Sequence, residues 1–169
     1  MRHIRLYTIT VFILFFALLF SACGVQRSEE TGCPFSSVLW DTDAEKLISI
    51  EGESDEIYAS VYGGDTLTYS KDYLGHSGTL KYMFSEDGRL ASIAWAYVTE
   101  DAKDLVALYK EIDEFEISKN GKSQFSPENS TSYGDVWYLK DRDVLISTIF
   151  GTDSCGLQYA YIHHDFSKH

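Results

Sequence analysis

The chain has 169 residues and a formal charge of −12, from 26 acidic and 14 basic side chains. The basic side chains form no cluster, which argues against nucleic-acid binding, because that function depends on Lys and Arg gathered against phosphates. The length allows one domain with a true core and is too short for two independent ones.

The first 23 residues predict an export signal. Arg2 and Arg5 precede a largely apolar run from Leu6 to Phe20. As a helix this run would span roughly 22 Å, short of the roughly 30 Å hydrocarbon core of a bilayer. We therefore expect a removed signal rather than a permanent membrane span.

The end of this segment resembles the lipobox of bacterial lipoproteins. Ser21, Ala22 and Cys23 match the small-small-cysteine pattern, and Phe20 stands where that family usually has leucine. The resemblance implies a signal peptide at residues 1–22. It also implies a diacylglyceryl group on Cys23, whose two acyl chains suffice for stable anchoring.

That anchor would hold the protein at the cell membrane, on its extracytoplasmic face, or in the periplasm or at the outer membrane of a two-membrane cell. An ordinary secretory signal or an uncleaved anchor is the alternative. The polar stretch from Gly24 to Gly32 has no apolar periodicity. We expect residues 23–34 to be a lipidated cysteine with a flexible tether, and residues 35–169 to form a single globular domain.

Two cysteines remain if Cys23 carries lipid. Cys33 and Cys155 would form an even pair in a compartment where disulfides persist, so a bridge between them is expected. Two unpaired buried thiols are the alternative. Neither cysteine belongs to a cluster with zinc-ligand spacing.

The domain opens on a helix. Thr42-Asp43-Ala44-Glu45 is a capping box, with Thr42 as the expected cap, and Gly52 is the expected end. A second helix is expected from near Thr99 to Asn120, with Ala102, Leu105, Val106, Tyr109 and Ile112 on its buried side.

Seven strands are expected around these helices from their β-rich composition and turn residues. They are 57–62, 66–69, 80–84, 90–98, 136–139, 144–150 and 157–163. The stretch from Gly121 to Gly134 is expected to be a loop. The order αββββαβββ predicts an α+β fold with an antiparallel sheet of about seven strands and two helices packed on one face.

The other face of that sheet is expected to be open. Tyr58, Tyr62, Tyr69, Tyr159 and Tyr161 are candidates for a binding face there, since tyrosine offers large contact area with few torsions to freeze. Core packing of these tyrosines is the alternative.

No catalytic residues are predicted. Gly75-His76-Ser77-Gly78 is similar to a lipase nucleophile elbow, but its second glycine comes one residue early and a strand follows it. A hairpin loop with an exposed His76 is expected instead. Cys155 as a nucleophile would need His163 or His164 as its base.

No metal site and no cofactor are predicted either. His163 and His164 are adjacent in a strand, and adjacent strand residues point to opposite faces. Asp165 and His169 complete this apparent cluster, for which adventitious nickel or zinc binding is the expectation. Acidic runs at Glu51–Glu56 and Glu111–Glu116 are expected to be solvated. A surface that steers cationic partners or loosely holds calcium is the alternative.

The segment Val38–Glu45, centred on Trp40, resembles the start of the folded part in small uncharacterised lipoproteins. This resemblance implies no function. Together, these features predict a lipid-anchored, extracytoplasmic, non-catalytic binding module for a protein, peptide or envelope glycan. A hydrolase with dispersed carboxylates and histidines, or an inhibitor of secreted enzymes, are the alternatives.

Overall fold

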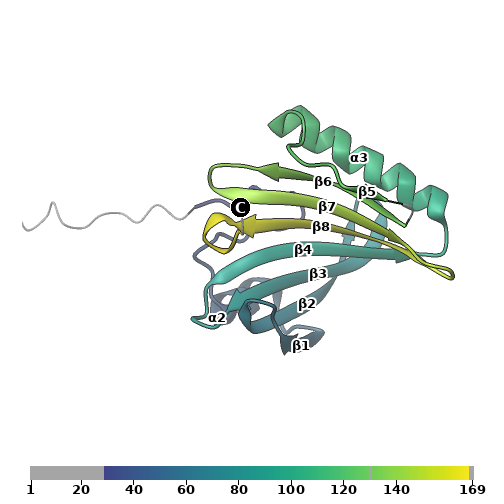
Figure 1. The fold of residues 1–169 in the computed structure, drawn as a ribbon. Helices are drawn as coiled ribbons and strands as arrows, with labels where there is room; N and C mark the ends of the chain where they lie inside the picture. The colour runs from purple at the N-terminus through teal and green to yellow at the C-terminus, as the bar shows by residue number, and fades with distance from the viewer. Residues whose placement is uncertain (1–28, 130, 168–169) are drawn as a thin grey trace, which may run out of the picture.

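The computed structural model describes residues 29–129 and 131–167. The expected signal peptide, Cys23 and His169 lie outside the described residues. Within the described ranges, eight strands form one antiparallel sheet accompanied by two α-helices, an α+β fold (Figure 1). No helix in the same ranges has both the length and the apolar character to span a bilayer.

The elements follow the predicted alternation, with one addition. In chain order they are α2 (Ala44–Glu51), β1 (Glu56–Ala59), β2 (Gly63–Tyr73), β3 (His76–Ser85), β4 (Leu90–Thr99), α3 (Ala102–Asn120), β5 (Glu128–Asn129), β6 (Ser132–Tyr138), β7 (Arg142–Phe150), β8 (Cys155–His163) and a 3-10 turn (His164–Phe166). About seven strands were expected, and the described residues form eight. The additional strand is the short β5, which lies inside the stretch predicted as a loop.

The sheet consists of two meanders joined along their last strands. Its order is β1-β2-β3-β4-β8-β7-β6-β5, so β4 and β8, separated in sequence by α3 and three strands, are neighbours (Figure 1). They pair without a shift from Ser92↔Ile162 to Thr99↔Cys155. This long-range pairing joins the two halves of the sheet.

Both helices begin at an aspartate. The side chain of Asp43 accepts from the backbone N–H of Lys46 at 2.8 Å, which caps α2. Thr42, the expected cap, instead accepts from the N–H of Leu39. Asp101 caps α3 by accepting from Lys103 and Asp104, two residues later than the predicted start. Each helix therefore begins where a carboxylate satisfies its free N–H groups.

The core lies on the face of the sheet that the helices cover. Directly opposed residues of an antiparallel pair point to the same face, and the register therefore places large side chains in two rows on that face. One row is Leu80, Trp95, Tyr159 and Ile146; the next is Tyr82, Ile93, Tyr161, Val144 and Trp137, all fully buried. Leu47 of α2 and Leu105, Leu108 and Ile112 of α3 pack into the same core.

One turn needs an unusual backbone conformation, and one strand position needs a glycine for a close approach. The β2–β3 hairpin reverses at Leu74 and Gly75, whose φ angles are +50° and +81°. At Gly64 the chain passes so close to β3 that an added Cβ would lie 2.3 Å from the carbonyl oxygen of Ser85. Only glycine fits there.

The end of the expected tether is part of the folded domain. The carbonyl of Glu29 accepts from the N–H of Trp40 at 3.0 Å, and the hydroxyl of Thr31 donates to the carbonyl of Val38 at 3.2 Å. Both bonds fold the chain back on itself before residue 35. The expected boundary there was wrong, because these backbone groups find partners inside the domain.

Candidate functional site

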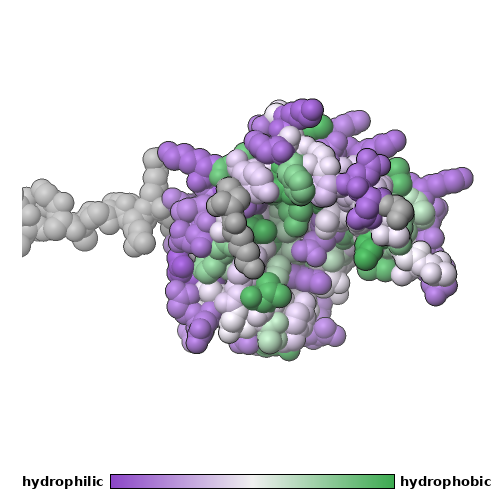
Figure 2. All heavy atoms as spheres, viewed as in Figure 1, coloured by the Kyte–Doolittle hydropathy of each residue, from purple (hydrophilic) through white to green (hydrophobic). Residues whose placement is uncertain are grey.

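The face of the sheet away from the helices forms a trough of three adjoining hollows. Their volumes are about 590, 450 and 400 Å³. Leu145 lines the first two, while Ala96 and Val98 line the second and third. Figure 2 shows one side of the molecule, where hydrophobic residues lie in several separate groups among hydrophilic ones.

Small side chains make the trough deep. Opposed residues across the sheet form rows of Lys81, Ala94, Ala160, Leu145 and Val136, and of Thr79, Ala96, Gln158, Ser147 and Gly134. Two exposed aliphatic side chains stand on either side of Gly156: Val98 is 69% exposed and Ile149 is 65% exposed. The middle hollow therefore offers apolar contact, while charged residues line the two outer hollows.

The expected tyrosine face does not form. Tyr159 and Tyr161 are fully buried and Tyr69 is 7% exposed, all on the helix-covered face. Only Tyr62 lines the trough, at one end, with its ring against Phe166. Tyr58 is 43% exposed on the short edge strand β1. The prediction was wrong for the three buried residues because the register places them in the rows that contact α2 and α3.

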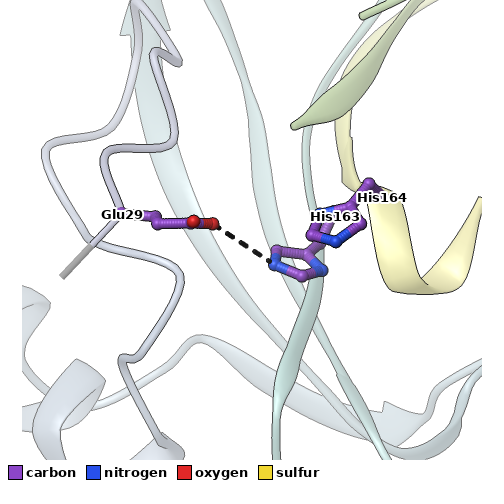
Figure 3. Close-up of side chains that lie close together, drawn as sticks. All are labelled: Glu29, His163 and His164. Atoms are coloured by element: carbon purple, nitrogen blue, oxygen red, sulfur yellow. Dashed lines mark ion pairs between the residues drawn. The ribbon is translucent and has the colours of Figure 1, made fainter. Parts of the chain in front are cut away.

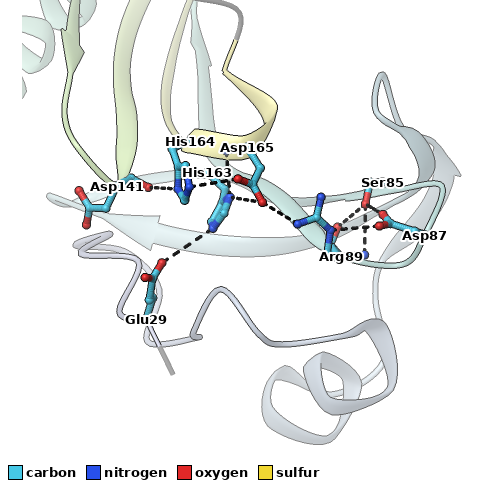
Figure 4. A network of polar contacts seen from close by, with 8 residues as sticks. All are labelled: Glu29, Ser85, Asp87, Arg89, Asp141, His163, His164 and Asp165. Atoms are coloured by element: carbon cyan, nitrogen blue, oxygen red, sulfur yellow. Dashed lines mark hydrogen bonds and ion pairs between the residues drawn. The ribbon is translucent and has the colours of Figure 1, made fainter. Parts of the chain in front are cut away.

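A second candidate site lies where β8 ends. A pocket of about 520 Å³ is lined by Glu29, Trp40, Asp41, Thr42, Asp43, Gly88, Arg89, His163, His164 and Asp165. We call it the histidine pocket. It brings together the first described residues, the β3–β4 turn and the C-terminal end of β8. Figure 4 shows its polar side chains converging from these three segments.

Two histidines and a glutamate lie close enough in this pocket to share one ion. Glu29, His163 and His164 each offer one ligand atom, and these atoms all lie within 4.8 Å of one another (Figure 3). The Nε2 atom of His163 is 3.9 Å from Oε2 of Glu29. The expectation that the two histidines point apart was wrong, because β8 stops at His163 and the 3-10 turn begins at His164.

Carboxylate and carbonyl oxygens fix the orientation of these rings. Asp165 lies 3.0 Å from Nε2 of His164 and 3.8 Å from Nδ1 of His163. Arg89 holds Asp165 at 2.7 Å, and this hydrogen bond lowers the pKa of the Asp165 carboxyl. Nδ1 of His164 lies 3.2 Å from the carbonyl oxygen of Asp141 (Figure 4).

Burial keeps one of the two rings neutral. His163 packs edge-on against Trp40 at 5.2 Å between ring centroids, and its side chain is only 13% exposed. Desolvation, and then the nearby His164, lower the pKa of His163. The ring is therefore unprotonated at neutral pH, the form that binds metal ions.

One acidic residue expected in solvent is in the core. Glu116 of α3 is fully buried, where its carboxylate accepts hydrogen bonds from the hydroxyls of Tyr159 and Tyr161 and from the amide of Asn120. We call these four residues the carboxylate cluster. Both carboxylate oxygens of Glu116 have partners inside the protein, and these contacts tie α3 to β8.

The two cysteines do not form the expected disulfide. Cys33 and Cys155 are both free and buried. Cys155 lies 3.3 Å from the carbonyl of Thr99, just before α3, whereas Cys33 lies near Glu116 at the other end of that helix. The 19 residues of α3 span roughly 28 Å, far beyond the roughly 7 Å that a disulfide can bridge.

The motif that is similar to a nucleophile elbow forms no such site. His76 and Ser77 are the first residues of β3 and point to opposite faces of the sheet, as their partners Tyr73 and Asp72 show. The His76 side chain is 22% exposed and packs on Tyr97, so it is not the exposed loop residue that we expected. Cys155 and His163 stand at opposite ends of β8, too far apart to act as a pair.

Comparison with family models found no match to this chain, and searches of curated proteins and of solved structures found none either.

Proposed function

We propose that this chain is a lipid-anchored, extracytoplasmic binding module, and that its trough takes an apolar segment of a peptide or protein. The observation that supports the trough as the binding surface is its lining. Val98 and Ile149 are exposed aliphatic side chains on either side of Gly156, and aliphatic or small residues line most of the middle hollow on the face that neither helix covers.

The lining favours a peptide or protein over a glycan. Glycan sites rely on exposed aromatic rings with polar groups beside them. The middle hollow is lined mainly by alanine, valine, leucine, isoleucine, serine and glycine, and its two tyrosines, Tyr97 and Tyr133, contact α3 on the other face of the sheet. The edges of the sheet are poor templates for strand addition, because β1 has four residues and β5 has two. A partner would therefore bind across the face.

The anchor is tested by mass spectrometry of the full chain recovered from membranes. The expected product begins at Cys23 with a diacylglyceryl group, and Cys23→Ala is expected to abolish both the modification and the membrane association. An intact Met1 start on cytosolic material would contradict the proposal.

The trough is tested by a photo-crosslinking amino acid placed at residue 149 of the full chain in its native cells. We expect a discrete crosslinked protein, which disappears when Leu145→Arg places a charge on the trough floor. The matched control is the same probe at Ile117, which is 44% exposed on α3. Equal crosslinks at both positions would contradict the trough as the binding surface. A crosslinked glycan would contradict the proposal that the partner is a peptide or protein.

A further inference from the structure

The histidine pocket has the chemistry of a transition-metal site. Imidazole nitrogen and carboxylate oxygen suit zinc and its neighbours in the first transition row, whereas calcium and magnesium prefer oxygen alone. We propose that Glu29, His163 and His164 bind one divalent transition-metal ion, with Zn²⁺ as the representative ligand.

The spacing is close to what such an ion needs. Ligand atoms around tetrahedral zinc, with bonds of 2.0–2.1 Å, lie roughly 3.3 Å apart. Here the pair formed by His163 Nε2 and Glu29 is at 3.9 Å, and all three ligand atoms lie within 4.8 Å (Figure 3). A movement of about 1 Å closes the site, and Glu29, with a side chain 61% exposed, is free to make it.

The second shell matches the arrangement found around metal-bound histidine. Such rings hold their other nitrogen against a carbonyl or a carboxylate, which fixes the ring for the ion. Nδ1 of His164 lies 3.2 Å from the carbonyl of Asp141. Nδ1 of His163 lies 3.8 Å from the carboxylate of Asp165, which Arg89 holds in place.

Two rearrangements limit the affinity. Nε2 of His164, the nitrogen that would bind the ion, lies 3.0 Å from the Asp165 carboxylate and has to exchange that contact for the metal. Nδ1 of His163 accepts from the backbone N–H of Asp165 at 3.2 Å. Binding through Nε2 leaves the ring proton on Nδ1, so that hydrogen bond is replaced by one to the Asp165 carboxylate. The pocket is otherwise suited to a cation, because Glu29, Asp41, Asp43 and Asp165 outnumber its single arginine.

The proposal is independent of the trough, because neither histidine lines it. It is tested by isothermal titration of ZnCl₂ into the full chain, purified in detergent with a tag that contains no histidine. We expect one equivalent to bind. Both His163→Ala and His164→Ala should weaken binding by more than about tenfold, and Glu29→Gln by a smaller factor.

A histidine outside the pocket serves as the control. His76→Ala, at the start of β3, should leave the zinc affinity unchanged. His164 and Glu29 are both largely accessible, with side chains 48% and 61% exposed, so their variants should fold even if the His163 variant does not. Circular dichroism checks this.

Cobalt(II) gives a second readout, since a four-coordinate nitrogen and oxygen site produces visible absorption bands that His164→Ala should remove. The proposal is overturned if the wild-type chain binds no stoichiometric zinc, if the His164 variant binds zinc as tightly as the wild type, or if His76→Ala abolishes binding.

Discussion

The carboxylate cluster and the histidine pocket both contain ionisable side chains, but these side chains are buried in the cluster and line an accessible cavity in the pocket. In the carboxylate cluster, a fully buried Glu116 has hydrogen-bond partners for its carboxylate within the protein. In the histidine pocket, the candidate ligand atoms of Glu29, His163 and His164 lie within 4.8 Å of one another beside an open cavity, and the ion pairs of both histidines are to side chains 40% or more exposed. Burial with internal partners indicates a structural role, whereas converging ionisable groups at an accessible pocket indicate a binding site.

The largest effect should come from breaking the saturated cluster. Glu116→Ala leaves the hydroxyls of Tyr159 and Tyr161 without their acceptor in the core, and we expect a loss of about 4 kcal/mol in the free energy of unfolding. Urea denaturation measures it. Glu114→Ala, at an exposed position on the same helix, is the control and should change stability by less than about 0.5 kcal/mol. A small loss in the Glu116 variant would contradict the structural role.

The histidine pocket should respond in the opposite way. His164→Ala should leave the stability of the metal-free chain nearly unchanged, because the ring is half exposed. Zinc at a hundred times its dissociation constant should stabilise the wild-type chain by about 2.7 kcal/mol, and thermal unfolding of the His164 variant should show no such gain. A zinc-dependent shift that persists in this variant would remove the contrast between the two regions.

Alkaline pH should act mainly on the covered face. Burial raises the pKa of Tyr73 to about 12 and raises those of Tyr82, Tyr159 and Tyr161, compared with 10.0 for an exposed phenol. Well below pH 10 both states keep the proton on these tyrosines, and their contribution to stability is complete. Above pH 10 only the unfolded chain ionises, so stability should fall by roughly 1.4 kcal/mol per pH unit for each of them.

Urea midpoints between pH 8 and 11 measure this slope, and Tyr159→Phe should make it shallower because one of the buried phenols is gone. A slope identical to that of the wild type would mean that Tyr159 ionises as freely in the folded state as in the unfolded one.

The smallest effect should come from Asp113, a partly buried carboxylate that lacks a full set of hydrogen-bond partners in the described part of the chain. Asp113 of α3 has one buried oxygen without a hydrogen-bond partner among the described residues. Burial, together with Asp135 and Glu114, raises its pKa, so its charge opposes folding at neutral pH. Asp113→Asn should therefore stabilise the chain by about 0.5–1 kcal/mol. Asp101 is not a suitable control position, because its carboxylate caps α3. Differential scanning calorimetry at pH 7 resolves such a gain, and a loss would show that the charge has a partner.

Local signals accounted for most of the elements. Apolar stripes, turn pairs such as Asp87-Gly88 and glycines at helix ends predicted both helices and the seven longer strands. The β2–β3 hairpin was harder, because Leu74 adopts a positive φ that its side chain disfavours. The β4–β8 pairing could not be predicted, since nothing local marks strands that meet across 60 residues.

The candidate sites depended on this kind of long-range strand pairing. Tyr159 and Tyr161 could be assigned to a face only once β8 was placed beside β4. The burial of Glu116 could have been predicted, because it lies four residues after Ile112 and continues the buried stripe of α3. No pattern in the sequence marked Glu29 as a residue of the histidine pocket, since its partner His163 is distant in the sequence.

The hydrogen bond between Glu29 and Trp40 has a consequence for where a partner must be. Residues 24–28 are the only ones between Cys23 and this bond, and a fully extended chain of that length reaches roughly 20 Å. If Cys23 carries the acyl chains, the domain stays within one protein diameter of the lipid headgroups. Its partner would then have to be another resident of the same membrane surface, or a molecule that passes close to it.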